Sequence, residues 1–154
     1  MASFAMSSSL PRESAAELDV SLVRLYLLRA TYLLLVVGLG AVMVPEIVSH
    51  APISRGVIPS LLGGVWALAF LGLRYPLQML PLLMFEFVWK SIWMISYGLP
   101  QSLAGHAPPT FAEDFASIAL GVILMPLVIP WGYVYRRYVR LPGARWRAVP
   151  KTVA

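Results

Sequence analysis

The sequence contains no cysteine and few charged residues. Asp, Glu, Lys and Arg together make up 12% of the 154 residues, whereas a soluble domain carries about 25%. So few charges cannot cover a water-facing surface, and 59% of the residues are hydrophobic. The absence of cysteine excludes disulfides and thiolate metal sites. Lipid is therefore the expected solvent for most of this chain.

The sequence also lacks the motifs of common catalytic and metal sites. It has no phosphate-binding loop, no nucleophile elbow and no HExxH pair. The two histidines, His50 and His106, fall in expected loops outside any fixed-spacing motif. We therefore predict no metal site, no cofactor and no catalytic residues, and these absences argue against an enzyme.

Basic residues exceed acidic ones, giving a net charge of +5. Six of the twelve cations lie between Arg136 and Lys151, directly after a hydrophobic segment. A basic tail in that place is typical of a topology signal that also touches anionic lipid. The sequence does not show the alternation of basic and aromatic residues that is typical of a folded nucleic-acid-binding surface. We therefore expect membrane lipids as partners and no nucleic acid.

Four apolar segments predict an all-α fold, specifically a four-helix transmembrane bundle. A helix needs about 20 apolar residues to cross the bilayer core, and the expected spans cover about 22–44, 57–73, 76–99 and 115–135. The bundle as a whole covers 22–138, between a polar segment at 1–21 and a basic tail at 139–154. Pro45 is expected to end the first span, and Pro126 and Pro130 to kink or break the fourth.

The cations between the spans predict the orientation. Arg12, Arg24, Arg74 and the basic tail fall on one side of a four-span chain. The loops on the other side hold Arg55 as their only cation. The positive-inside bias therefore places both termini in the cytoplasm.

Glu86 and Lys90 lie in the middle of the third expected span. They are four residues apart and therefore share one helix face. Glu86 lies ten residues after Pro76, or about 15 Å along a helix, near the midplane of the bilayer. A charge there costs about 2.5–3.5 kcal/mol on insertion scales, so it is kept only for a compensating gain. The pair is either a ligand or proton site or a structural ion pair.

Other polar and aromatic residues are expected to extend this site. Trp93 and Tyr97 continue the same stripe at spacings of three and four. Arg29 lies about five residues into the first span, where it either snorkels to the surface or turns inward toward Glu86. An inward Arg29 would form a triad suited to an anionic head group or a quinone carbonyl, with Tyr32 one turn further along. Ser117 and Gly121 form a small-xxx-small pair, typical of close helix contact in lipid.

The stretch RYPLQMLPLLMFEFVWKSIWMISYGLP at 74–100 resembles a YP–MLPLL–FE–WK–IW arrangement in small bacterial four-span membrane proteins that have no assigned function. In size and number of spans the chain is also similar to the DoxX-like four-helix membrane proteins, a likeness of architecture alone. The resemblance implies a bacterial inner membrane and no particular activity.

Two classes of function follow from these patterns. The first is a binding or accessory protein whose intramembrane charges hold a lipid-like ligand, a second copy of the chain or a partner membrane protein. The second is a small proton-coupled transporter or carrier that uses Glu86. The two differ in whether Glu86 changes its proton or its partner during a cycle.

Overall fold

The computed structural model describes residues 20–49, 56–105 and 108–141, and all regular structure in these ranges is helical. The all-α class expected from the sequence is confirmed. The polar segment expected at 1–21, with Arg12, lies almost wholly outside the described residues. So does most of the basic tail expected at 139–154. His50, Arg55 and His106 also lie outside them.

The first two helices form an antiparallel hairpin. Helix α2 covers Leu22–Val48 and begins at Ser21, whose hydroxyl accepts a hydrogen bond from the Arg24 amide at 3.4 Å. Helix α3 covers Val57–Arg74. The two helices are joined along their length by packing and by the Trp66 indole, which donates to the Val36 carbonyl at 2.8 Å.

Helix α2 continues past Pro45, where the sequence predicts its end. Proline lacks one amide donor but has a φ angle that suits a helix. The Ser49 amide donates to the Pro45 carbonyl at 2.9 Å and closes the last turn. The proline therefore costs one hydrogen bond without ending the helix.

In place of the third expected span at 76–99, the structure has a continuous helical path from Leu80 to Ala104, in three parts. Helix α4 covers Leu80–Trp93, the π-helical turn η2 covers Met94–Gly98, and helix α5 covers Leu99–Ala104. The path ends at Gly105, whose φ of 71° is the left-handed conformation that glycine adopts without strain. The wider η2 turn interrupts the helical periodicity, which matters for the residues expected on one stripe.

Helix α6 covers Phe111–Val128 and is followed by a break, helix α7 at Trp131–Val134 and the π-helical turn η3 at Tyr135–Arg140. The break falls at Ile129, which is extended because it precedes Pro130. Pro130 has no amide to give to the Pro126 carbonyl, four residues earlier. The Trp131 indole donates to that carbonyl instead, at 2.9 Å. The break expected from the two prolines therefore falls at Pro130, whereas Pro126 lies within α6.

Within the described ranges, three helices are long and apolar enough to cross a membrane by length and composition: α2, α3 and α6. Helix α4 alone has 14 residues, fewer than the roughly 20 that a span needs. The chain thus has the character of a multi-pass membrane protein with three candidate spans. A fourth span would require α4, η2 and α5 to cross the membrane as one continuous helix.

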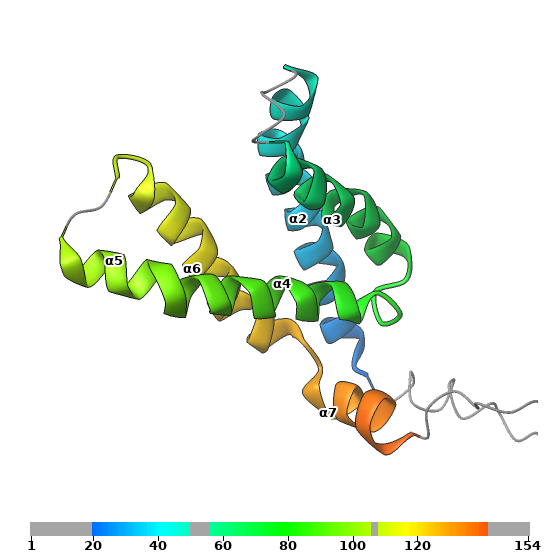
Figure 1. The fold of residues 1–154 in the computed structure, drawn as a ribbon. Coiled ribbons are helices and arrows are strands. Elements are labelled where there is room, and N and C mark those ends of the chain that lie inside the picture. Colours follow the sequence, from blue (N-terminus) through cyan, green and yellow to red (C-terminus); the bar gives the residue numbers. More distant parts are fainter. Residues whose placement is uncertain (1–19, 50–55, 106–107, 142–154) are drawn as a thin grey trace, which may run out of the picture.

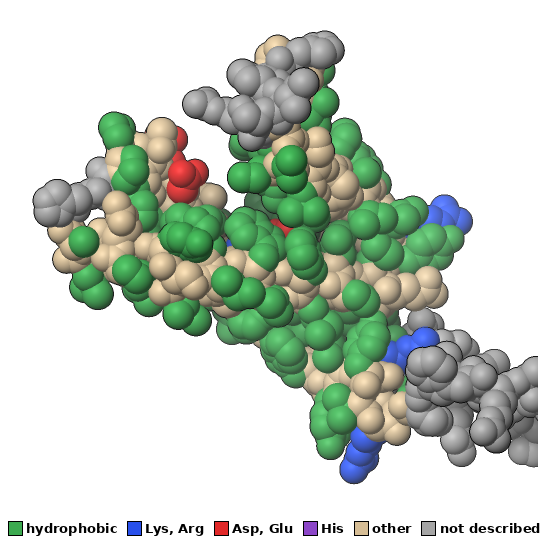
Figure 2. All heavy atoms as spheres, in the orientation of Figure 1, with side chains coloured by type: hydrophobic (Ala, Val, Ile, Leu, Met, Phe, Trp, Pro, Cys, Tyr) green, Lys and Arg blue, Asp and Glu red, His purple; other side chains and the backbone are tan. Residues whose placement is uncertain are grey.

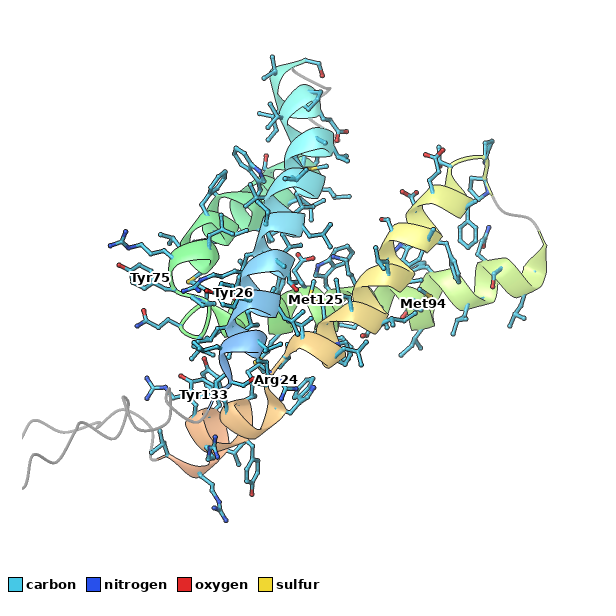
Figure 3. All side chains as sticks on the ribbon, turned by 180° about the vertical axis from the view of Figure 1, so that it is seen from behind. Arg24, Tyr26, Tyr75, Met94, Met125 and Tyr133 are labelled. Atoms are coloured by element: carbon cyan, nitrogen blue, oxygen red, sulfur yellow. The ribbon has the colours of Figure 1, made fainter. Side chains whose placement is uncertain are left out.

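The helices form two arms that meet at one end (Figure 1). One arm is the α2–α3 hairpin. The other consists of α4, η2 and α5, with α6 crossing α4. The start of α2, the α3–α4 turn and α7 lie together at the shared end, and both views show the arms diverging from it (Figures 1 and 3). The fully buried side chains Leu28, Tyr32, Leu80, Leu83 and Ile129 form the core near this junction.

Candidate functional site

Glu86 and Lys90 form a salt bridge one turn apart on α4. The Glu86 side chain is completely buried, and Lys90 is 8% exposed. Burying two charges costs several kcal/mol per ion, and their attraction offsets that cost only with good geometry and further hydrogen bonds. The surroundings of the pair therefore decide whether it is a stable arrangement.

Trp89 supplies the further hydrogen bond. Its indole Nε1 donates to Glu86 Oε1 at 3.0 Å, while the Lys90 ammonium donates to Glu86 Oε2. The Lys90 Nζ atom also lies 4.7 Å from the centre of the Trp89 ring, within the range of a cation–π contact. Both carboxylate oxygens are therefore satisfied. We did not predict Trp89 from the sequence, although its position three residues after Glu86 places it on the same face.

Helix α6 crosses the pair at Gly121. A Cβ atom on Gly121 would lie 2.5 Å from Lys90 Cδ and 2.8 Å from Lys90 Cε. The lysine stem therefore occupies the space that any larger residue at 121 would fill. The group that approaches Gly121 is thus a side chain, whereas the sequence pattern predicts close contact between helices.

A cleft lies between the two arms, with the lysine in its wall. Its volume is about 440 Å³, within the range of about 300–1,000 Å³ that small-molecule sites occupy. Figure 2 shows this hollow between the arms, walled mainly by hydrophobic side chains. Lys90, Trp89, Asp114 and Ser117 line it together with apolar residues: Leu34, Leu35, Leu39, Val42, Met43, Leu62, Ile118, Leu120, Leu124 and Met125. Glu86 does not line it.

The polar groups of the cleft lie at two levels. Asp114 is in the first turn of α6, and Gly121, which contacts Lys90, lies seven residues further on. These positions are about 10.5 Å apart along the helix at 1.5 Å per residue. The ammonium is thus deep in the cleft, and the carboxylate of Asp114 is nearer to the open end.

Arg29 and Tyr32 do not join the Glu86–Lys90 pair. Arg29 is exposed, its guanidinium carbon lies 5.8 Å from the Tyr26 ring centre, and it lines a separate hollow at the α3–α4 turn. Tyr32 is fully buried and donates its hydroxyl to the Pro76 carbonyl at 3.3 Å. Arg29 therefore takes the outward position, which the sequence left open beside the inward one.

Trp93 still belongs to α4 and, three residues after Lys90, shares its helix face, whereas Tyr97 lies in the π-helical turn that follows. The Trp93 ring lies 6.2 Å from the Phe111 ring, centre to centre, and Tyr97 is 65% exposed. A stripe at spacings of three and four assumes an unbroken α-helix. The π-helical turn at Met94–Gly98 adds to the residues per turn and shifts everything after Trp93 around the axis. The expected stripe therefore ends at Trp93, and Tyr97 is not part of it.

Comparisons of the chain with protein-family models, with curated proteins and with solved structures gave no match. Among residues 20–49, 56–105 and 108–141, no group of three or more His, Cys, Asp or Glu side chains is placed to hold a metal ion. The chemistry of the site therefore rests on a buried ion pair, one indole donor and an apolar cleft.

Proposed function

We propose that this chain is a four-span protein of a bacterial plasma membrane, and that it binds a lipid-like molecule in the cleft between its two arms. The occupant has an apolar body and a carbonyl or carboxylate head. The body lies against the walls formed by α2 and α6, and the head accepts a hydrogen bond from the Lys90 ammonium.

The continuity of the third helical path supports the fourth span. From Leu80 to Ala104 the backbone stays helical through η2, a length of roughly 35 Å at about 1.5 Å per residue. That length suffices for a bilayer core of about 30 Å. An even number of spans agrees with the start of α2 and the end of η3 lying at the same end of the molecule (Figure 1).

The distribution of arginines supports cytoplasmic termini. Arg24, Arg74, Arg136, Arg137 and Arg140 all belong to the elements at the shared end: the start of α2, the end of α3 and η3. Acidic Glu113 and Asp114 lie in the first turn of α6, in the other direction. The positive-inside bias then assigns the shared end to the cytoplasm.

The unequal exposure of the two charged side chains is the observation that carries the proposed binding. Lys90 lines the cleft, whereas Glu86 is sealed behind it. An ammonium has three donor hydrogens, and Glu86 is the one hydrogen-bond acceptor that Lys90 has in the described structure. Donors therefore remain for a ligand, and the ion pair keeps the lysine in place for it.

The same geometry disfavours a proton-coupled carrier. A carrier carboxylate must exchange protons with water or change its partner. Glu86 is fully buried, both of its oxygens accept hydrogen bonds, and it does not line the cleft. If the protein took up protons as its ligand moved, that result would favour a proton-coupled carrier over a binding protein.

The absence of cysteine permits a direct binding test. We would replace Ser117, which lines the cleft, by cysteine and attach an environment-sensitive fluorophore. Ala116→Cys is the matched control, because Ala116 precedes it on α6 and does not line the cleft. Both proteins would be titrated in detergent with oleate and with oleyl alcohol, which has the same chain without the carboxylate.

We expect oleate to shift the fluorescence of the Ser117→Cys protein saturably, and Lys90→Met to weaken this binding about tenfold, as for the loss of one charge-assisted hydrogen bond. Equal, non-saturating shifts at both labels would mean that oleate only enters the micelle, and they would overturn the proposal. A shift that follows protein concentration without oleate would identify a second copy of the chain as the occupant.

A further inference from the structure

A second hollow, distinct from the cleft, lies at the shared end of the molecule. It has a volume of about 250 Å³ and is formed by α2, the end of α3 and the turn that leads into α4. Its polar wall consists of Arg29, Arg74, Tyr75 and Gln78. No acidic side chain lines it, and it shares no lining residue with the cleft between the arms.

Packing of α2 against the turn brings the two arginines together. Tyr32, three residues after Arg29, donates to the carbonyl of Pro76, two residues after Arg74. Gly72 permits this approach, because a Cβ atom there would lie 2.2 Å from the Tyr32 ring. Residues distant in sequence are thus fixed at one level of the hairpin, and this placement is set by buried contacts.

The arginines are oriented by aromatic rings without being neutralised. The Arg74 Nε donates to the Tyr75 hydroxyl at 3.0 Å, and its guanidinium carbon lies 5.5 Å from that ring centre. Arg29 lies over Tyr26 in the same way. Tyr26 and Tyr75 lie at the same end of the hairpin in Figure 3. Within the described ranges, neither Arg29 nor Arg74 forms an ion pair. The salt bridge found there joins Glu86 and Lys90.

We propose that this hollow binds a phosphate group, with Arg29 and Arg74 as the two guanidinium ligands and Gln78 as a neutral donor. A guanidinium has a planar fork of donors that matches phosphate oxygens. Two cations that share one hollow repel each other, and a phosphate removes this repulsion. Basic pockets beside membrane helices on the cytoplasmic side bind phospholipid head groups, and a free phosphate ester offers the same chemistry.

The test compares lipid with free phosphate on the full chain in neutral detergent. Native mass spectrometry would count bound phosphatidylglycerol and phosphatidylcholine molecules. A parallel thermal-shift titration would use inorganic phosphate. The variant is Arg29→Gln with Arg74→Gln. The control is Arg24→Gln, which removes one exposed arginine from the same helix at a position that does not line the hollow.

We expect phosphatidylglycerol to bind in preference to phosphatidylcholine. Each arginine replaced should weaken binding about fivefold, and both together about 25-fold. Arg24→Gln should leave binding within about twofold. Saturable protection by inorganic phosphate that the double variant loses would assign the same site to a soluble phosphate compound.

Two results would overturn the proposal. One is equal weakening in the Arg24→Gln control and in each single variant, which would indicate diffuse surface charge. The other is binding of neither lipid nor phosphate by a wild-type chain that unfolds cooperatively. Replacing both arginines by lysine keeps the charge but removes the forks, so a loss of selectivity in that protein supports the guanidinium geometry even if the glutamine variant is poorly folded.

Discussion

Replacing Gly121 by alanine should destabilise the protein, although alanine is the better helix former. The added methyl group would lie 2.5 Å from Lys90 Cδ, far closer than the roughly 3.5–4.0 Å at which carbon atoms make favourable contact. Lys90 cannot turn aside freely, because its ammonium is held by Glu86 and lies over Trp89. Either the lysine leaves the carboxylate or α6 moves away from α4.

The magnitude follows from two opposing effects. Overpacking a filled site costs about 1–3 kcal/mol. Alanine in place of glycine within a helix gains about 1 kcal/mol. If the ion pair breaks, a stranded buried charge adds about 3–5 kcal/mol. A net loss of up to about 2 kcal/mol is expected if α6 yields, and a larger loss if Lys90 does.

Gly64→Ala is the matched control. Gly64 is exposed within α3, and a Cβ atom there meets nothing within 4 Å. The Gly64→Ala substitution should leave the stability of the protein unchanged or raise it. We would measure thermal unfolding of both variants by circular dichroism in one detergent. Equal melting temperatures for Gly121→Ala and Gly64→Ala would refute the packing of Lys90 against α6.

Three further predictions concern the helix junctions and the topology. Tyr32→Phe should lower stability by about 1 kcal/mol, because the Pro76 carbonyl loses its donor; an unchanged melting temperature would contradict this. Trp131→Phe should cost a similar amount by leaving the Pro126 carbonyl unpaired, whereas Trp131→His, which keeps a ring donor, should recover part of the loss if that bond matters. A reporter fused to the C-terminus should be active on the cytoplasmic side, and activity on the outer side would reverse the assigned orientation.

The helical fold could be predicted because its signal is local. Apolar runs long enough to span a bilayer gave the α2, α3 and α6 segments, and the four-residue spacing of Glu86 and Lys90 predicted their shared face. Both features depend on residues within one helix. The arrangement of two diverging arms depends on which helices contact each other, and a periodicity does not encode that.

The site was predicted only in part for similar reasons. The π-helical turn after Trp93 changes the register, and nothing in the residue pattern marked it. Arg29 could snorkel or turn inward by length alone, and its exposed position depends on how α2 packs against the rest of the molecule. Trp89 carried a usable signal, the spacing of three from Glu86, but aromatic residues are frequent enough in this chain that spacing did not distinguish it.

The central claim is that Glu86 and Lys90 are a mutual pair that holds the lysine at the cleft. Melting temperatures of Glu86→Gln, Lys90→Met and the double variant in one detergent test it most directly. We expect each single change to cost several degrees, because removing one partner of a buried pair costs about 3–5 kcal/mol, and the double variant to recover most of the loss. A Glu86→Gln protein as stable as the wild type would contradict the claim and point to a carboxylate kept for proton or ligand exchange.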